Sequence, residues 1–484
     1  MPDVLGGAAI PVRRVTSGPL QGGPVKAVYG YFAAPGDRPA GGGPAMPVRV
    51  LTSLEIAAGG YIVEGGAAIP VYDAPAGTPE MGGAALPVYA LNGVAAWPFS
   101  YLLRDEFTDT LAAGAVNGTP AVPGPGTRTV VDTNGIMSTS GGVLVVNGTP
   151  AANNRFHLGS VARVAGRVFK GTFPAMTTAP FAVIEFGWSI DGTTDVNGVP
   201  GIDYSSTTVI RPRDGISAKY SFTMGAAPHS VALVLRATGG WSFALVGGKW
   251  VMLYIHPTNA TATLFPKIML TGASAVNFTH DSFRVPQSLY IPTPLAYAAF
   301  GGANGPLGNT DVLGPDLQLS PVLAWADQVG TWAIATNKAT ASALAGGLAI
   351  ATVPTSSPDT HIRIALTRAG GSVGGVARYQ DASNYLRFSH DGTNALCEQV
   401  VAGVPTTLRT GAAAFVASAL IYLRVSGTTG WLFYNNAAVG ASFTIPASTQ
   451  KNHGLYTTNT GNTMDNFEAF PDGTGSEHAF LGLI

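Results

Sequence analysis

The sequence carries very little charge. Asp, Glu, Lys and Arg make up 11% of its 484 residues, less than half of the roughly 25% that is usual in globular proteins. The formal net charge is −1, and no run of Lys or Arg occurs. Nucleic acids and anionic membranes are bound through clustered positive charge. We therefore expect neither a nucleic-acid partner nor a membrane partner.

Cysteine is almost absent, and this excludes a disulfide framework within the chain. Cys397 is the one cysteine, so stability must come from packing or assembly. It stands in the strand-like run 395–401, which indicates a small packing residue rather than a nucleophile. The 63 glycines and 35 prolines suit short strands joined by many turns, and they are unfavourable for long helices.

Long apolar runs and targeting segments are missing as well. The N-terminus reads Met1-Pro2-Asp3-Val4, with no basic segment and no apolar segment of a leader. No stretch approaches the ~18 uninterrupted apolar residues of a membrane-spanning helix. We expect a protein that is made in a cytoplasm, is not exported by the general secretory route, and is released by lysis.

Internal repeats dominate residues 1–98. Two glycines, a short stretch of small and apolar residues, and then Pro-Val recur at 6–13, 42–49, 65–72 and 82–89. A fifth copy at 22–29 has Ala in place of the proline. The distance from glycine to proline is constant, while the copies start 16 to 23 residues apart. A fixed motif with variable linkers favours repeated docking units over a solenoid.

The chemistry of one copy supports docking. Gly-Gly permits a bend, and proline confines a strand to an edge. A strand of ~5 residues must lie on another surface to be stable, and several weak copies on one chain bind with avidity. A disordered Gly/Ala/Pro linker remains the alternative. The residues expected to anchor the arm to a partner are Pro11, Val12, Val28, Tyr29, Pro47, Val48, Pro70, Val71, Tyr72, Pro87, Val88 and Tyr89.

These Gly-Gly-x-Ala-x-Pro-Val-Tyr repeats resemble segments in virion proteins of tailed bacteriophages. The resemblance implies a virion structural protein, of the fibre or decoration type, whose residues 1–98 attach to capsid or tail subunits. Attachment to a symmetric particle favours a homo-oligomer, and a trimer is the expected number.

The rest of the chain reads as two copies of one domain, 99–292 and 293–484. Four landmarks recur at offsets of 184 to 200 residues: an early phenylalanine, an Asp-Gly-Thr turn, a Leu-Arg hairpin ending in Trp, and a closing Asp-x-Phe strand. They stand at Phe107, Asp191, Leu235 and Phe283 in the first copy, and at Phe300, Asp391, Leu423 and Phe467 in the second.

Strand and turn signals at roughly ten-residue spacing favour a β-sandwich. The order of the landmarks, with the Asn-Gly-Pro-Leu-Gly-Asn segment at 304–309, resembles the concanavalin A-like (laminin G-like) jelly roll. The expected fold is all-β, with an extended repetitive arm followed by two tandem jelly-roll sandwiches. The resemblance implies that the first and last strands lie side by side, which makes Phe107 with Phe283, and Phe300 with Phe467, candidate core contacts.

Catalysis is not expected. Glycosidases need two carboxylates beside one bond, which on a strand requires acidic residues at alternating positions. Glu185 stands alone in its strand, and Asp105 and Glu106 are adjacent. A serine or cysteine triad is not supported, and no His-x-x-x-His pair for zinc occurs. His280 and His390 lie beside turn aspartates and are expected at the surface.

Oxygen-rich loops and aromatic residues could bind metal ions or glycans. Asp191, Asp195 and Asn197, and likewise Asp311 and Asp316, could offer oxygen ligands to Ca²⁺. Turn residues that cap their own backbone explain them better, so no cofactor is predicted. Glycan binding uses exposed aromatic rings and polar loops. The tryptophans considered are Trp188, Trp241, Trp250, Trp325, Trp332 and Trp431, and each is expected to pack inside the fold.

The leading hypothesis is a capsid- or tail-attached fibre or decoration protein of a virion that displays two sandwiches, which bind host-surface glycans. The alternatives are a dedicated receptor-binding tail fibre with its specificity in 293–484, a soluble lectin or adhesin, and a glycan-degrading enzyme.

Overall fold

The computed structural model describes residues 101–474, except 152–153, 179–182, 194–199, 216, 258, 272–274 and 288, and also the two short strands β1 (Val28–Tyr29) and β2 (Pro47–Val48). The chain divides into two compact units, residues 1–98 and residues 99–484. Every regular element among the described residues is a strand. The predicted all-β fold class is confirmed. None of the described residues forms a helix that could cross a membrane.

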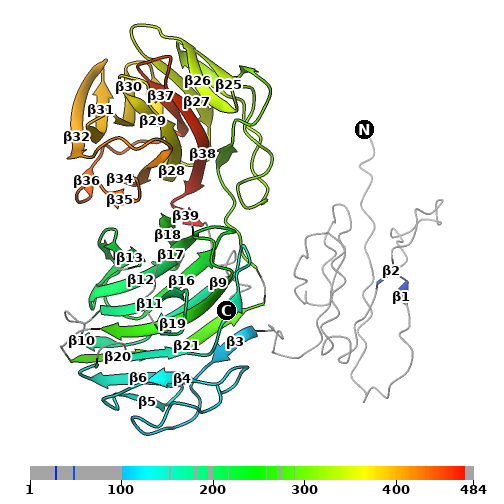
Figure 1. The fold of residues 1–484 in the computed structure, drawn as a ribbon, viewed down its shortest axis with the longest axis vertical. Coiled ribbons are helices and arrows are strands. Elements are labelled where there is room, and N and C mark those ends of the chain that lie inside the picture. Colours follow the sequence, from blue (N-terminus) through cyan, green and yellow to red (C-terminus); the bar gives the residue numbers. More distant parts are fainter. Residues whose placement is uncertain are drawn as a thin grey trace, which may run out of the picture. The chain divides into compact units, whose positions relative to one another are not determined.

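The first sandwich is built from strands within residues 101–286 (Figure 1). They are β3 (Tyr101–Asp105), β4 (Thr129–Val131), β5 (Met137–Ser140), β6 (Val143–Gly148), β7 (Asn154–His157), β8 (Val161–Ala162), β9 (Val168–Phe173), β10 (Met176–Thr178), β11 (Val183–Ser189), β12 (Pro200–Ser206), β13 (Val209–Asp214), β14 (Ser217–Ala218), β15 (Phe222–Thr223), β16 (His229–Leu235), β17 (Gly240–Val246), β18 (Lys249–His256), β19 (Thr263–Thr271), β20 (Val276–His280) and β21 (Ser282–Pro286).

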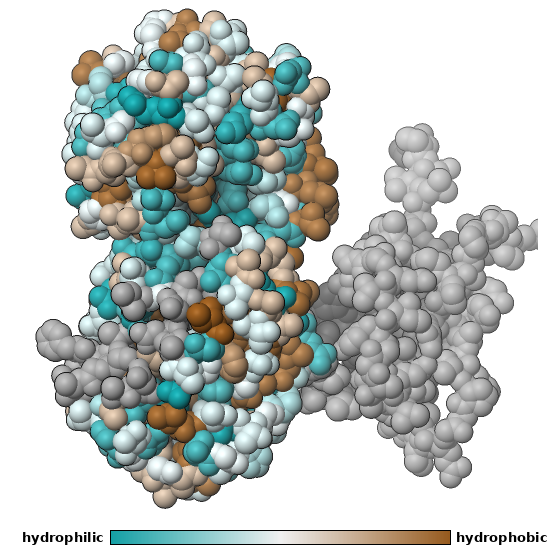
Figure 2. Space-filling model, viewed as in Figure 1, coloured by the Kyte–Doolittle hydropathy of each residue, from teal (hydrophilic) through white to brown (hydrophobic). Residues whose placement is uncertain are grey.

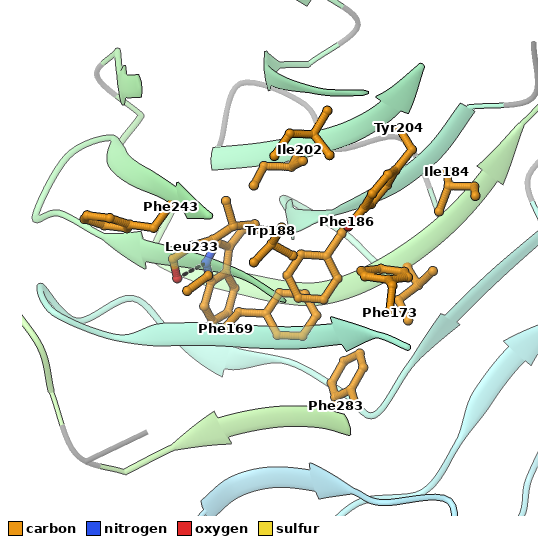
Figure 3. Packing of buried hydrophobic residues seen from close by; sticks show 14 of the residues in the cluster. Phe169, Phe173, Ile184, Phe186, Trp188, Ile202, Tyr204, Leu233, Phe243 and Phe283 are labelled. Carbon is orange, nitrogen blue, oxygen red and sulfur yellow. Dashed lines mark hydrogen bonds between the residues drawn. The ribbon is translucent and has the colours of Figure 1, made fainter. Parts of the chain in front are cut away.

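Two large antiparallel sheets face each other in this sandwich. One has the order β3-β21-β9-β16-β17-β18, and the other has β14-β13-β12-β11-β19-β7-β4 as its main path. A smaller sheet, β10-β20-β6-β5, completes the sandwich. Alternation along β11 turns Ile184, Phe186 and Trp188 inward. Phe186 stacks on Phe169 of β9 with 4.0 Å between ring centroids, and Figure 3 shows these rings between the two sheets. Aromatic packing between the sheets therefore holds this sandwich together.

The second sandwich is built from strands within residues 296–471. They are β22 (Ala296–Ala298), β23 (Gly305–Pro306), β24 (Ala326–Val329), β25 (Thr331–Ala335), β26 (Lys338–Ala343), β27 (Ala349–Pro354), β28 (Thr360–Thr367), β29 (Val373–Asp381), β30 (Asn384–His390), β31 (Asn394–Val401), β32 (Val404–Ala412), β33 (Ala419–Ser426), β34 (Thr429–Tyr434), β35 (Ala437–Ala438), β36 (Phe443–Thr444), β37 (Asn452–Thr457) and β38 (Thr463–Pro471).

Its two sheets are also antiparallel. The main path of one is β23-β25-β26-β38-β28-β33-β34-β35, and the other runs β24-β27-β37-β29-β30-β31-β32. Inward residues of both sheets form one buried cluster that includes Ile364, Phe388 and Cys397. The interpretation of Cys397 as a packing residue is confirmed, because the side chain is fully buried. Burial also raises the pKa of its thiol far above the usual value.

The first and last strands of each sandwich lie side by side, as the jelly-roll resemblance implied. β3 pairs with β21, and β22 pairs with β38. The expected contacts between phenylalanines are mediated by a third ring. Phe156 lies 5.5 Å from Phe107 and 5.4 Å from Phe283 between centroids.

In the second sandwich, Trp325 is the ring that lies between the early and the closing phenylalanine. It lies 5.7 Å from Phe300 and 5.2 Å from Phe467 between ring centroids. Phe107 and Phe300 also share the same left-handed backbone angle, φ 51°. The early phenylalanines of the two sandwiches therefore have equivalent conformations and equivalent packing.

The two sandwiches are joined by buried polar and aromatic contacts. Arg236 of the first binds Glu468 and Asp316 of the second, with nitrogen–oxygen distances of 3.0 and 2.8 Å. Arg424 Nη1 donates to the hydroxyl of Tyr220. The last described strand, β39 (Gly473–Thr474), pairs with the edge of β18. Residues of the second sandwich thereby extend a sheet of the first.

Candidate functional site

The structure describes four of the predicted anchoring residues of the arm. Val28 lies opposite Val48, and Tyr29 lies opposite Pro47, in the antiparallel pair β1–β2. Two copies of the repeat therefore pair with each other, and the valines that follow the proline position of each copy lie opposite one another. The other predicted anchoring residues lie outside the described residues, and their role stays a prediction: Pro11, Val12, Pro70, Val71, Tyr72, Pro87, Val88 and Tyr89.

An open hollow of about 450 Å³ lies in the second sandwich at the end of β29. It is lined by Gln380 and by the segment Ala447, Ser448, Thr449 and Gln450. Two primary amides and two hydroxyl groups therefore line it, with no charged side chain. Each amide offers both donors and an acceptor, and each hydroxyl can do either. We call this feature the glutamine hollow.

A β-bulge shapes one wall of the hollow. The register of β29 against β37 shifts between Val376 and Tyr379, and Arg378 within the bulge has a φ of 49°. A bulge inserts an extra residue and redirects the side chains that follow. Tyr379 is thereby buried, and Gln380 is exposed and reaches the hollow.

Arg378 also holds the start of the lining segment 447–450. Its guanidinium donates to the carbonyl of Pro446 at 2.7 Å and to the carbonyl of Gly427 at 2.8 Å. At the other end of the segment, Thr355 Oγ1 donates to the carbonyl of Lys451 at 2.7 Å. Residues 447–450 are thus held at both ends. The backbone on this side of the open hollow is therefore fixed before any ligand binds.

Tyrosines pack next to the hollow on the face of the sheet that points away from the core. Tyr379 stacks on Tyr385 with centroids 5.8 Å apart. Arg387 binds Glu398 at 2.7 Å and donates to the hydroxyl of Tyr456 at 3.0 Å. Burial raises the pKa of Tyr456 to about 12, so the hydroxyl stays neutral at physiological pH. On this face the acid Glu398 and the base Arg387 are paired with each other.

The first sandwich contains a carboxylate pair that the sequence reasoning missed. Glu185 is the one acidic residue of β11, as predicted, but it lies opposite Asp203 on the neighbouring strand β12. Arg213 Nη1 contacts Glu185 Oε1 and donates to Asp203 Oδ2 at 3.1 Å. Arg211 donates twice to Asp203, at 2.7 and 2.9 Å. The pair was missed because its members lie on neighbouring strands and not within one strand.

This arrangement suits a structural ion cluster better than acid–base catalysis. A glycosidase pair has one carboxyl group that keeps its proton and a gap that admits the scissile bond. Here one guanidinium binds both carboxylates, and Asp203 and Glu185 are buried. A bound guanidinium therefore lies where a glycosidase would leave a gap for substrate.

Both histidines that were expected at the surface are buried, so that expectation was wrong. His280 lies among aromatic rings, with centroids 4.7 Å from Phe173 and 5.9 Å from Phe186. Burial lowers its pKa to about 3. His390 Nε2 bonds the carbonyl of Ala413 at 2.9 Å. The period of two along β20 could have placed His280 inward, because alternate residues of that strand share the buried face.

The aspartates considered for Ca²⁺ have other partners. Asp191 Oδ1 accepts from the backbone N–H of Thr193 at 2.6 Å, as a turn cap does. Asp311 accepts from the backbone N–H of Ala299, and Asp316 binds Arg236. Asp195 and Asn197 lie outside the described residues. No cluster of three or more His, Cys, Asp or Glu that could hold a metal occurs in the described part of the chain.

The tryptophans belong to the fold, as predicted. Trp188, Trp241, Trp250 and Trp332 are buried, and Trp325 and Trp431 pack half-buried against the cores. None of the six offers a broad exposed ring for stacking a sugar. A ligand at the glutamine hollow would therefore be held mainly by hydrogen bonds.

Comparisons with known proteins find similarity in structure only. No family model matches the chain, and no curated protein matches its sequence. A carbohydrate-binding module from Bacillus subtilis aligns over 30% of this chain and 94% of its own, at 14% identity and a TM-score of 0.27. A Clostridium perfringens endo-β-galactosidase that releases GlcNAcα1-4Gal aligns over 76% and 98%, at 10% identity and 0.29.

Domains LG4-5 of the mouse laminin α1 chain align over 65% of this chain and 84% of their own, at 8% identity and a TM-score of 0.18. At these identities and scores the likenesses carry no functional argument. The fold assignment rests on the antiparallel sheets of this chain itself.

Proposed function

We propose that the chain is a non-enzymatic, glycan-binding structural protein of a bacteriophage particle. The glutamine hollow binds a neutral glycan of the host surface. Residues 1–98 attach the protein to capsid or tail subunits, and the assembled protein is a homo-oligomer.

The uncharged, preformed polar lining of the hollow carries the glycan part of the proposal. Gln380, Ser448, Thr449 and Gln450 present donors and acceptors in one place. A sugar offers hydroxyl groups that both donate and accept, so it can satisfy such a lining without a formal charge. Hydrogen bonds from Arg378 and Thr355 already hold the two ends of the lining segment 447–450. Little conformational entropy of this segment is therefore lost when a ligand binds.

The virion part of the proposal is supported by the repeats. Five short copies with constant internal spacing suit attachment to a surface that repeats itself. The antiparallel pairing of β1 with β2 is consistent with the repeats acting as short strands that need a partner strand.

Glycan binding is tested with an array of neutral and acidic oligosaccharides. The wild-type chain should bind neutral members, and the variant Gln380→Ala/Gln450→Ala should bind them at least tenfold more weakly. Gln399→Ala, at a half-buried glutamine of β31 outside the hollow, is the matched control and should bind like wild type. Equal binding by the wild-type and double-variant chains would place the site elsewhere.

The absence of catalysis is tested on the same glycans. Release of new reducing ends by the wild-type chain, and its loss in Asp203→Asn, would show hydrolysis and contradict the proposal. The virion assignment is tested by mass spectrometry and antibody labelling of purified particles. A chain found only in the soluble fraction after lysis would refute attachment to the particle.

A further inference from the structure

A loop of the second sandwich presents a cluster of exposed apolar side chains. It spans residues 310–323, between β23 and β24, and we call it the apolar loop. Figure 2 shows apolar surface where this loop emerges at one edge of the second sandwich. Five of its Leu and Val residues are 42–78% exposed: Val312, Leu313, Leu317, Leu319 and Val322. Single exposed apolar residues are ordinary, whereas a contiguous group marks an interaction site.

Backbone hydrogen bonds hold the loop in one conformation. The N–H of Gly314 donates to the carbonyl of Gln318 at 2.7 Å, and the N–H of Ser320 donates to the carbonyl of Val312 at 2.9 Å. At the base, the N–H of Thr310 donates to the carbonyl of Leu323 at 2.8 Å. The apolar side chains are therefore presented by a preformed surface.

The charges of the loop point toward the chain itself. Asp311 Oδ2 accepts from the backbone N–H of Ala299 at 2.7 Å. Asp316 binds Arg236 at 2.8 Å and accepts from the N–H of Ala237 at 2.8 Å. No other residue of the loop is charged. Both charges of the loop are already bound within the chain, so a charged partner surface would find no opposite charge here. The surface that binds the loop must therefore be apolar.

The size of the surface fits one side of a protein–protein interface. At 42–78% exposure, the five residues form a patch of a few hundred Å² (about 300–600 Å²), the size of patches that mark interaction sites. A standard interface buries about 800 Å² on each partner, of which slightly more than half is apolar. The loop thus supplies about the apolar area that one partner contributes.

We propose that the apolar loop binds the same loop of a second copy of this chain across a twofold axis. A twofold contact uses one patch on both partners, so a single apolar surface is enough to build it. With a net charge of −1 per chain, two copies approach with almost no repulsion. The partner is a second copy because each chain already carries a surface of the required size and chemistry.

The test measures the mass of the full chain in solution by light scattering and sedimentation velocity, at tens of micromolar. The wild-type chain should have an even multiple of the 49.4 kDa chain mass, and Leu317→Asp/Leu319→Asp should halve it. Val401→Asp/Val404→Asp is the matched control, because these residues are 52% and 65% exposed on the β31–β32 hairpin. It should keep the wild-type mass.

Circular dichroism and melting temperature verify that each variant is folded. A wild-type monomer would overturn the proposal, and so would an oligomer that survives the loop substitutions in the folded variant. If the wild-type chain is monomeric and protease cuts residues 1–98 faster in the loop variant, the patch binds the arm of its own chain, which also overturns the proposal.

Discussion

Replacing Arg378 by methionine tests whether the support of the glutamine hollow is understood. The side chain of Arg378 is 2% exposed, and it donates to the carbonyls of Pro358, Gly427 and Pro446 at 3.1, 2.8 and 2.7 Å. Each lost hydrogen bond costs about 1 kcal/mol in stability. The ion pair with Asp359 adds only about 0.5 kcal/mol, because that carboxylate is 41% exposed.

The expected loss in the free energy of unfolding is therefore about 3.5 kcal/mol for Arg378→Met. At about 2–4 °C per kcal/mol for a domain of this size, the melting temperature should fall by roughly 7–14 °C. Urea unfolding followed by tryptophan fluorescence and scanning calorimetry both measure the change. Arg368→Met is the control, because Arg368 donates one exposed hydrogen bond, to the carbonyl of Gly371, and should cost less than about 0.5 kcal/mol. A loss below about 1 kcal/mol for Arg378→Met would refute the reasoning.

Three further predictions concern buried groups. The folded-state pKa of His280, about 3, lies below its unfolded value of about 6.5, so the stability from its neutral form is complete above pH 6.5 and falls as the pH drops toward 3. His280→Phe should therefore unfold at lower pH than wild type in an acid titration, and an unchanged midpoint would contradict this. Arg213→Met leaves the buried carboxylates of Glu185 and Asp203 without their shared cation and should cost about 3 kcal/mol or more in urea unfolding; a neutral effect would show that the cluster is not structural. The buried Cys397 thiol should react with Ellman's reagent at pH 8 only after unfolding, and stoichiometric labelling of the folded chain within minutes would contradict its burial.

The sequence predicted most local structure because turns and alternation are local signals. Asp391-Gly392-Thr393 forms the turn between β30 and β31, with Asp391 Oδ1 accepting from the N–H of Thr393 at 2.8 Å. The Leu-Arg hairpin of the second sandwich became β33–β34. These features need only a few consecutive residues to be recognised.

The candidate site could not be predicted, because it depends on contacts between distant segments. Gln380 and Gln450 are 70 residues apart in the sequence, and they meet because a bulge in β29 and the bonds of Arg378 place them together. The pairing of Glu185 with Asp203 has the same cause, since it requires the register of two strands. The prediction that His280 lies at the surface was wrong. The adjacent Asp281 suggested an exposed turn, whereas the alternation along β20 buries His280.

The most direct test of the account is a crystal structure of the full chain with the neutral oligosaccharide that binds best on the array. The account predicts sugar density in the glutamine hollow, with hydroxyl groups within hydrogen-bond distance of Gln380 and Gln450. Density over Glu185 and Asp203 of the first sandwich, or a hollow that stays free of sugar while the chain binds glycan in solution, would contradict it.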